Sequence, residues 1–420
     1  MNDQPSQSQK GTLERLFDTA ATLFREKGYT ATTTREIASA LGIQQASLYY
    51  HIESKEDLLY QLCVSSLDQI RSDVERAVGE VHDPLGRVRA LIRAHLATLL
   101  TYQVRHVTML RELRALSSRH HAEVLRLRKQ YGSLVRSVLE EAQSAGVVRN
   151  DIPAQYLYLA LLNVLNWAVI WFRRDQELPA ERLYGLFTPV FLNGAAARPA
   201  RVPPIVAEVP TGPKRKPAAR GRKTETAEKP TAERMLTAAA TLFSKKGYAA
   251  TSTREIAGLL QIQKASLYYH IQSKEDLLYS ICKSSLDEIR QDVEAAIEKT
   301  ADPLERTRTL IRAHIESMLR EQDRHSATLS EMRSLSKERL ADVIALRDAY
   351  EELVRSVLQE AQDAGALRDD IPVKYLCLIL LGLVNRVEVW YRPNGALAPA
   401  ELGEILAAIF LTGAVRSARD

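Results

Sequence analysis

The strongest constraint on this chain is an internal repeat that covers nearly its whole length. The string AATLF at residues 20–24 returns at 239–243, and SLYYHI at 47–52 returns at 266–271. Both strings are displaced by 219 residues. Solenoid repeats span only about 20 to 50 residues. The 420 residues are therefore expected to form two copies of one arrangement, each large enough to bury its own core.

The apolar residues of each copy follow helical spacing. In the first copy they stand at 13, 16, 17, 20, 23 and 24, which is one face of a helix. Gly28 is suited to end that helix, and Ser54, with acids after it, is suited to begin a long one. Further helices are expected near residues 84, 105 and 119, and two apolar helices from Pro153 and Pro179. No segment has a convincing strand pattern, so the predicted class is all-α.

Residues 34–51 have the proportions of a helix-turn-helix. A short helix is expected to begin at Thr34, Gly42 allows a tight turn, and residues 44–51 would form a second helix whose start can enter the major groove of DNA. The expected core positions are Ile37, Ala38, Leu41, Ile43 and Leu48. The residues left facing outward are Gln44, Gln45, Ser47 and Tyr49. Glutamine can pair with adenine, and hydroxyl groups reach base edges or phosphates.

The motifs of this region resemble the N-terminal domain of the TetR family of transcriptional regulators. They are Gly28-Tyr29, Thr34 with Ile37-Ala38, Leu41-Gly42-Ile43, SLYYHI at 47–52 and SKEDL at 54–58. The second copy repeats them, except that Gln261 stands where the turn glycine is usual. The resemblance covers nearly the full length of both copies and is most specific over the first 60 residues of each.

The resemblance implies DNA contacts from both copies. Phosphate contacts are implied for Thr34, Tyr50, His51 and Lys55, and base contacts for Gln44, Gln45, Ser47 and Tyr49. The counterparts in the second copy are Thr253, Gln263, Lys264, Ser266, Tyr268, Tyr269, His270 and Lys274. Two other interpretations stay open: one of Tyr49 and Tyr50 packs the small domain, and Gln44, Gln45 and Lys55 are solvated surface residues. Because Lys264 replaces Gln45, and lysine favours guanine, the operator is expected to be a near-palindrome.

The resemblance also implies two tandem units, each with a three-helix DNA-binding domain followed by a helical effector and dimerisation domain. The DNA-binding domains are placed at 1–60 and 231–279, and the effector domains at 61–197 and 280–420. Residues 198–230 would form a proline-rich linker, which holds eight Lys or Arg residues against one acid up to Lys223. Such a segment is expected to stay semi-extended and to enter a minor groove or follow phosphates, although a solubilising role is equally open.

The effector domains carry polar residues on otherwise apolar helices. The candidates for effector binding are His95, Glu112, Arg114, Arg128, Tyr131, Asn166, Trp167 and Trp171, with His314, Glu331, Arg333, Arg347, Tyr350, Asn385 and Trp390 in the second copy. Such residues can hold an acidic ligand, and internal salt bridges fit the pattern equally well. The Asn and Trp positions resemble the subgroup of the family that senses acyl-CoA thioesters, although the tryptophans also suit an interface core.

Other function classes lack their motifs. There are no paired catalytic carboxylates, no nucleophile elbow and no phosphate loop, so an enzyme is not expected. The three cysteines form no CxxC pair, which argues against zinc and fits a reduced cytosolic protein. No apolar run reaches the roughly 18 residues that span a bilayer, so no membrane association is expected.

We therefore expect a bacterial, cytoplasmic and nucleoid-associated repressor that binds a double-stranded DNA operator. A small-molecule effector, with an acyl-CoA thioester as the candidate, would release it, and no cofactor is expected. The alternatives are an architectural DNA-binding protein and an activator without an effector. The two copies are expected to pair within one chain through residues 153–194 and 372–413, with a further homodimer left open. The unlike residues Trp167 and Arg386 suit an interface between two different halves.

Overall fold

The computed structural model describes residues 7–171, 180–193, 231–395 and 397–412, which fall into two compact units. The first unit ends at Thr188 and the second begins at Pro189. This division falls inside a helix, and the linker expected at 198–230 lies outside the described residues. The described part of the chain contains helices and no β-strand, which confirms the all-α prediction.

In the first copy α1 to α3 correspond to the expected DNA-binding domain, and the helices that follow correspond to the expected effector domain. The elements of this copy are α1 (Gln7–Lys27), α2 (Thr34–Leu41), α3 (Gln45–Leu48), α4 (Lys55–Gly79), α5 (Pro84–Thr101), α6 (Gln103–Glu112), the 3-10 turn η1 (Leu113–Ala115), α7 (Ser118–Ser144), α8 (Ala154–Trp171) and α9 (Ala180–Asn193). The helix starts agree with those expected from the sequence to within two residues.

The second copy repeats this order with one interruption. Its elements are α10 (Thr231–Lys246), α11 (Thr253–Leu260), α12 (Lys264–His270), α13 (Lys274–Ile297), α14 (Pro303–Arg320), α15 (Gln322–Glu331), the 3-10 turn η2 (Met332–Ser334), α16 (Lys337–Asp363), α17 (Val373–Val384), α18 (Val387–Trp390) and α19 (Pro399–Thr412). Where α8 is continuous, α17 and α18 are separated at Asn385 and Arg386, and Arg386 is the residue that replaces Trp167.

The third helix of the first copy is shorter than expected. The sequence predicted a helix over residues 44–51, but α3 spans only Gln45–Leu48, with Gln44 as its extended N-cap. The backbone beyond Leu48 tightens into a turn, in which the His51 amide donates to the Leu48 carbonyl at 2.9 Å. The prediction is therefore wrong at this end, because a tight turn replaces the last helical residues. In the second copy α12 continues to His270, as expected.

The two helix-turn-helix elements turn in the same way, although only one of them has glycine there. Gly42 ends α2 with a φ of 70°, and Gln261 ends α11 with a φ of 58°. Glycine adopts this left-handed conformation freely, whereas a residue with a side chain is strained in it. The turn geometry is thus preserved in the second copy at a cost in backbone strain.

The predicted core of the helix-turn-helix is confirmed. Ile37, Ala38 and Leu48 are buried, and Leu41 and Ile43 are partly buried and pack against the same apolar cluster. The three small helices therefore close on one apolar interior, with their polar residues left for the surface.

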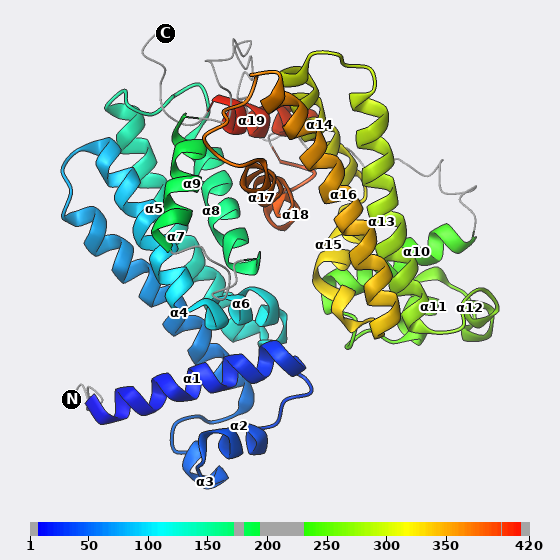
Figure 1. Ribbon diagram of the computed structural model, residues 1–420. Coiled ribbons are helices and arrows are strands. Elements are labelled where there is room, and N and C mark those ends of the chain that lie inside the picture. Colours follow the sequence, from blue (N-terminus) through cyan, green and yellow to red (C-terminus); the bar gives the residue numbers. More distant parts are fainter. Residues whose placement is uncertain (1–6, 172–179, 194–230, 396, 413–420) are drawn as a thin grey trace. The chain divides into compact units, whose positions relative to one another are not determined.

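The apolar core also joins each DNA-binding domain to the effector helices. In the first copy the cluster that contains Ile37 continues to Met109 on α6 and Val124 on α7. Figure 1 shows α1 between the reading helices α2–α3 and α6, and α1 packs directly on α6. An equivalent cluster forms in the second copy. Within a copy, a shift of α6 would therefore displace α1 as well.

Candidate DNA interface and effector site

The start of α2 is fixed by a capping box. The Thr33 hydroxyl accepts from the Glu36 amide at 3.2 Å, and Glu36 Oε2 accepts from the Thr33 amide at 2.8 Å. Lys27 at the end of α1 donates to Glu36 Oε1 at 2.7 Å. This hydrogen bond, with those from Thr33, lowers the pKa of the Glu36 carboxyl to about 2. The side chain of Thr34, the first residue of α2, takes no part in this capping box and can make other contacts.

Thr34 connects α2 and α3, the two helices of the helix-turn-helix, which we call the reading element. Its hydroxyl oxygen accepts from Gln45 Nε2 at 3.1 Å and shares a hydrogen bond with the Tyr49 hydroxyl at 3.2 Å. In the second copy Thr253 and Tyr268 repeat the hydroxyl contact at 3.2 Å. Three of the residues expected to contact DNA are therefore held together as one hydrogen-bonded group in copy 1.

The remaining reading residues lie open to solvent. Gln44, Ser47, Gln263 and Ser266 are exposed, and Tyr50 and Tyr269 are 79% and 87% exposed. Tyr50 therefore does not pack the small domain, and Tyr49 is itself 48% exposed. His51 is partly buried, and its ring stands perpendicular to the Tyr50 ring with 5.3 Å between the ring centres. The side chains of Lys264 and His270 lie outside the described residues.

Lys55 has a role that the sequence did not predict. Its ammonium group donates to the carbonyl oxygens of Tyr29, Thr30 and Thr32 at 2.9, 3.4 and 2.8 Å, and lies 4.3 Å from the centre of the Tyr29 ring. Lys274 makes the corresponding bonds in the second copy, to the carbonyls of Tyr248 and Thr251.

This geometry argues against the phosphate contact expected of Lys55. An ammonium group has three donors, and carbonyl oxygens of the loop before the helix-turn-helix take up all three of Lys55 and two of Lys274. Burial lowers the pKa of both lysines. We therefore assign these lysines to holding the loop that leads into α2 and α11.

Two of the expected effector residues meet in the interior of each copy. The His95 Nδ1 atom on α5 lies 2.5 Å from the Tyr131 hydroxyl on α7, and His314 lies 2.6 Å from Tyr350. All four side chains are buried. Burial lowers the pKa of His95 and His314 to about 3 and raises that of both tyrosines, so these groups are uncharged near pH 7.

A second buried histidine adjoins each pair, and the sequence analysis missed it. His106 on α6 is fully buried and lies close enough to His95 to affect its pKa. His325 on α15 contacts His314, with 6.3 Å between the ring centres. Both belong to an Arg-His pair that recurs at the 219-residue spacing, which is the signal that could have revealed them. We call these residues the His–His–Tyr cluster: His95, His106 and Tyr131, and His314, His325 and Tyr350.

The other effector candidates are not gathered at this cluster. Arg114, Arg333 and Arg347 are exposed, and Arg128 is partly buried on α7. Glu112 and Glu331 lie toward the DNA-binding domains, where they act electrostatically on Lys55 and Lys274.

Of the asparagine and tryptophan candidates, only Asn385 is shown to contact the cluster. Asn385 lies beside His314 and raises its pKa slightly against the effect of burial. The indole nitrogens of Trp167 and Trp390 are buried without a hydrogen-bond partner. Asn166 is partly buried on α8, and the side chain of Trp171 lies outside the described residues.

A buried arginine connects the effector helices to the DNA-binding domain in each copy. Arg105 on α6 is 4% exposed, and it donates to Asp18 at 2.6 Å and pairs with Glu14, both on α1. Arg324 on α15 is 2% exposed and pairs with Glu233 on α10 and, at 3.1 Å, with Glu288 on α13. The sequence analysis did not single out either arginine.

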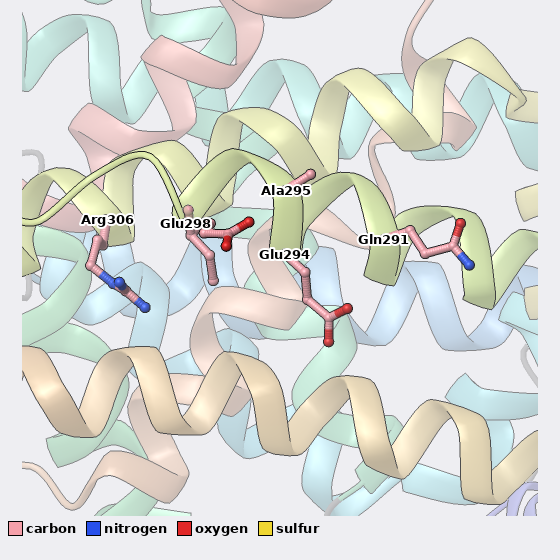
Figure 2. A pocket seen from close by; sticks show the side chains of 6 residues that line it. Gln291, Glu294, Ala295, Glu298 and Arg306 are labelled. Atoms are coloured by element: carbon pink, nitrogen blue, oxygen red, sulfur yellow. The ribbon is translucent and has the colours of Figure 1, made fainter.

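A hollow on the surface of the second copy has the wrong chemistry for an acidic effector. It lies at the end of α13 and the start of α14 and is lined by Gln291, Glu294, Ala295, Ile297, Glu298 and Arg306 (Figure 2). Its two carboxylates repel an anion, and Arg306 is 3.5 Å from Glu360. None of the expected effector residues lines it.

The cysteines and the potential metal ligands add no further site. Cys63, Cys282 and Cys377 are free and buried, and burial raises the pKa of each thiol to about 12. Within the described ranges, no three His, Cys, Asp or Glu side chains come together in a way that could hold a metal ion. No described helix is long and apolar enough to cross a membrane.

Two family models match this chain, and each matches twice. The model described as "Bacterial regulatory proteins, tetR family" matches residues 16–62 and 235–281. The model described as "Tetracyclin repressor-like, C-terminal domain" matches residues 81–195 and 300–414. The matches include the reading elements and the His–His–Tyr clusters of both copies.

Individual relatives match over the length of one copy. The HTH-type transcriptional repressor KstR2 of Rhodococcus jostii is 29% identical over 196 residues, which is 44% of this chain and 92% of the relative. The crystal structure of the TetR family regulator PfmR from Thermus thermophilus is 33% identical and covers 42% of this chain and 96% of its own, with a TM-score of 0.40. The structure of KstR2 of Mycobacterium tuberculosis is 26% identical, covers 43% and 92%, and also has a TM-score of 0.40.

Proposed function

The chain belongs to the TetR family of bacterial regulatory proteins, with both family domains present twice, and we propose that it is a transcriptional repressor released from DNA by a small molecule. The observation that carries the proposal is the reading element. Thr34, Gln45 and Tyr49 form one hydrogen-bonded group beside the exposed Gln44 and Tyr50. Chromosomal DNA as the target would place the protein at the bacterial nucleoid. The repressor relatives support the direction of control.

The proposal is tested by selecting DNA fragments that the full chain binds and then measuring transcription from the genes beside them. We expect one set of related sequences and higher transcription when the gene for the protein is deleted. Lower transcription in the deletion strain would contradict repression and favour an activator. Binding without sequence preference would favour an architectural DNA-binding protein.

We further propose that one chain acts as the dimer, because it supplies two like domains at high effective concentration. The stretch between the copies, about 30 residues long, could extend to roughly 100 Å, which is ample for two domains of this size. The unlike residues Trp167 and Arg386 fit a pairing of different halves. Light scattering tests this proposal. A mass near that of one chain supports it, and a stable two-chain mass at nanomolar concentration contradicts it.

The operator of such a chain is a near-palindrome. Gln45 can both donate to and accept from a base edge, and its Nε2 already donates to Thr34. Lys264, at the same position of the second copy, can only donate, and it prefers the acceptors of guanine. One base pair in each half-site therefore differs, while the other reading residues are alike.

For the effector we propose an acyl-CoA thioester. The resemblance at Asn166, Trp167 and Trp171, and at Asn385 and Trp390 in the second copy, supports this class, together with the buried polar residues at the centre of each effector domain. Titration of thioesters of different chain lengths against labelled operator DNA tests it. Release at micromolar concentration supports the proposal, and a complex that persists with every thioester favours a protein without such an effector.

A further inference from the structure

The His–His–Tyr cluster leaves hydrogen-bonding atoms unused in the interior of the protein. His95 Nε2 is buried and has no hydrogen-bond partner among the described residues, and the buried ring of His106 interacts only with the Tyr102 backbone. In the second copy both ring nitrogens of His325 are buried without a partner, whereas the His314 ring also interacts with the Asn385 side chain. Each unpaired buried polar group costs about 1–3 kcal/mol, so native proteins contain few of them. Unpaired imidazole nitrogens thus occur in the cluster of both copies, which indicates a function that offsets this cost.

The unused atom of His95 is a hydrogen-bond donor. The phenol of Tyr131 is a stronger acid than a neutral imidazole, so the Tyr131 hydroxyl donates to Nδ1 of His95. The single proton of the neutral ring then lies on Nε2 and is available to an acceptor. In the second copy Tyr350 bonds to His314 in the same way, but Asn385 already interacts with the His314 ring, and the unpaired nitrogens are those of His325. Each cluster therefore offers an N–H group that lacks an oxygen acceptor, on His95 in the first copy and on His325 in the second.

The acceptor that fits this cluster carries no charge. Burial holds the pKa of His95 and His106 at about 3, so neither ring can supply a positive charge near pH 7. Arg105, which is adjacent in sequence, is already paired with Glu14 and Asp18. A carboxylate or phosphate brought to this position would lose its hydration without gaining an opposite charge, which is strongly unfavourable.

We propose that the His–His–Tyr cluster of each copy binds the uncharged oxygen, a carbonyl or a hydroxyl, of an otherwise apolar effector. The inference rests on the proposed ligand-responsive function and specifies which part of the ligand lies deepest. Charged groups of the same ligand stay away from the cluster. The oxygen can belong to a thioester or to an ester, ketone or alcohol that lacks coenzyme A.

The position of the cluster links it to the DNA-binding domain. His106 belongs to the cluster, and Arg105, the preceding residue on α6, is bound to α1. His325 and Arg324 have the same relationship to α10. A ligand oxygen bound at the cluster would therefore act on α1 in the first copy and on α10 in the second, the helices on which α2 and α11 pack.

The test uses the full chain on fluorescently labelled operator DNA and four ten-carbon probes. These are decanoyl-CoA, its thioether analogue S-decyl-CoA without the carbonyl oxygen, methyl decanoate and the decanoate anion. We expect decanoyl-CoA to release the protein at a concentration at least tenfold lower than S-decyl-CoA, because only the thioester satisfies the buried donor. Methyl decanoate that acts where decanoate does not would also support the inference and would identify a ligand without coenzyme A.

Two results separate the failure of this inference from that of the proposed function. The uncharged-oxygen site is overturned if the thioester and the thioether both release the protein with equal potency, or if methyl decanoate and decanoate both do so; either result leaves a ligand-responsive repressor in place. Release by none of the four probes, while the operator is still bound, overturns both the acyl effector and this site.

A variant supplies the structural control. His95→Leu combined with His325→Leu removes the unpaired N–H group of each copy at similar volume. We expect the protein to remain folded and the tenfold preference for the thioester to disappear. His121→Leu is the matched control, because the second copy already carries Leu340 at that position, and it should retain the preference. A lower melting temperature with an unchanged preference would show that the imidazoles serve the fold, and would overturn the inference.

Discussion

The Nε atom of Arg105 donates to the Asp18 carboxylate at 2.6 Å, although the arginine side chain is 4% exposed and the aspartate side chain 64%. The bond joins α6 of the effector domain to α1 of the DNA-binding domain. In the second copy Arg324 instead bonds to α13 as well as to α10. The two copies thus share one acidic partner, Glu14 or its equivalent Glu233, and differ in the second, which is Asp18 in one copy and Glu288 in the other.

Arg105→Met is expected to weaken the response to effector more than the binding of effector. The carboxylates of Glu14 and Asp18 can rehydrate, so the free energy of unfolding should fall by about 1–3 kcal/mol. The effector concentration needed for half-release from DNA should rise at least tenfold. Calorimetry of effector binding and fluorescence anisotropy of the DNA complex measure the two effects separately. Release at an unchanged concentration would show that α6 does not act through this bond.

Lys55→Met is expected to reduce DNA affinity without changing its dependence on salt. The loop before α2 loses three hydrogen bonds, and the domain should lose about 1–3 kcal/mol of stability. Lys129→Met, at an exposed position on α7, controls for the change in net charge. The slope of log affinity against log salt concentration distinguishes the two roles of Lys55. A slope smaller by about one unit in the variant would show that Lys55 contacts a phosphate directly.

Gln261→Gly is expected to stabilise the second copy, and Gly42→Gln to destabilise the first. Both residues hold a left-handed φ, and this conformation costs a residue with a side chain about 1 kcal/mol more than glycine. Differential scanning calorimetry of the two variants measures shifts of opposite sign. Equal shifts in the same direction would mean that the surroundings, and not the backbone angle, set the preference.

Exchange of one reading residue is expected to change the symmetry of the operator. Lys264→Gln should select a fully symmetric sequence, because both copies then carry glutamine there. Gln45→Lys should also select a symmetric sequence, with guanine favoured at the position that differed. Each change is worth about 1–3 kcal/mol of discrimination. Sequencing of DNA selected by the three proteins gives the answer, and an operator already symmetric for the original chain would refute the assignment.

Acid is expected to destabilise each copy through its buried histidines. Burial lowers the pKa of His95, His106 and His314 to about 3 and that of His325 to about 4, against about 6.5 in the unfolded chain. Below pH 6.5 the unfolded state binds protons that the folded state does not. The free energy of unfolding should then fall by about 1.4 kcal/mol per pH unit for each histidine. His106→Leu with His325→Leu should halve this part of the slope. Unfolding curves of both proteins between pH 7.5 and 5 measure the slope, and an equal slope in the variant would contradict the prediction.

The sequence was sufficient to predict the arrangement but not the detailed use of individual side chains. The spacing of apolar residues and the positions of Gly28 and Ser54 determine where helices end, because these are local effects. The burial of Ile37 and Leu48 follows from the same periodicity. The helix starts and the core of the reading element were therefore predictable, whereas the end of α3 was not.

The roles of Lys55 and His106 were not predictable, because they depend on residues distant in sequence. Lys55 bonds to carbonyls 23 to 26 positions earlier, at a loop whose path only the folded chain defines. His106 looks like any polar residue on a helix until the helices packed on α6, which are α1, α4, α5 and α8, bury it. Arg105 was overlooked for the same reason, since its partners lie 87 and 91 positions away.

The left-handed backbone at Gln261 also bears on how the protein would leave DNA. A strain of about 1 kcal/mol makes local opening of a segment about fivefold more frequent. The turn of the second copy would therefore open more often than that of the first, even when the rest of the two domains is equally stable. On an operator held by both copies, dissociation would then begin at the half-site of the second copy, and the first would be the last to separate.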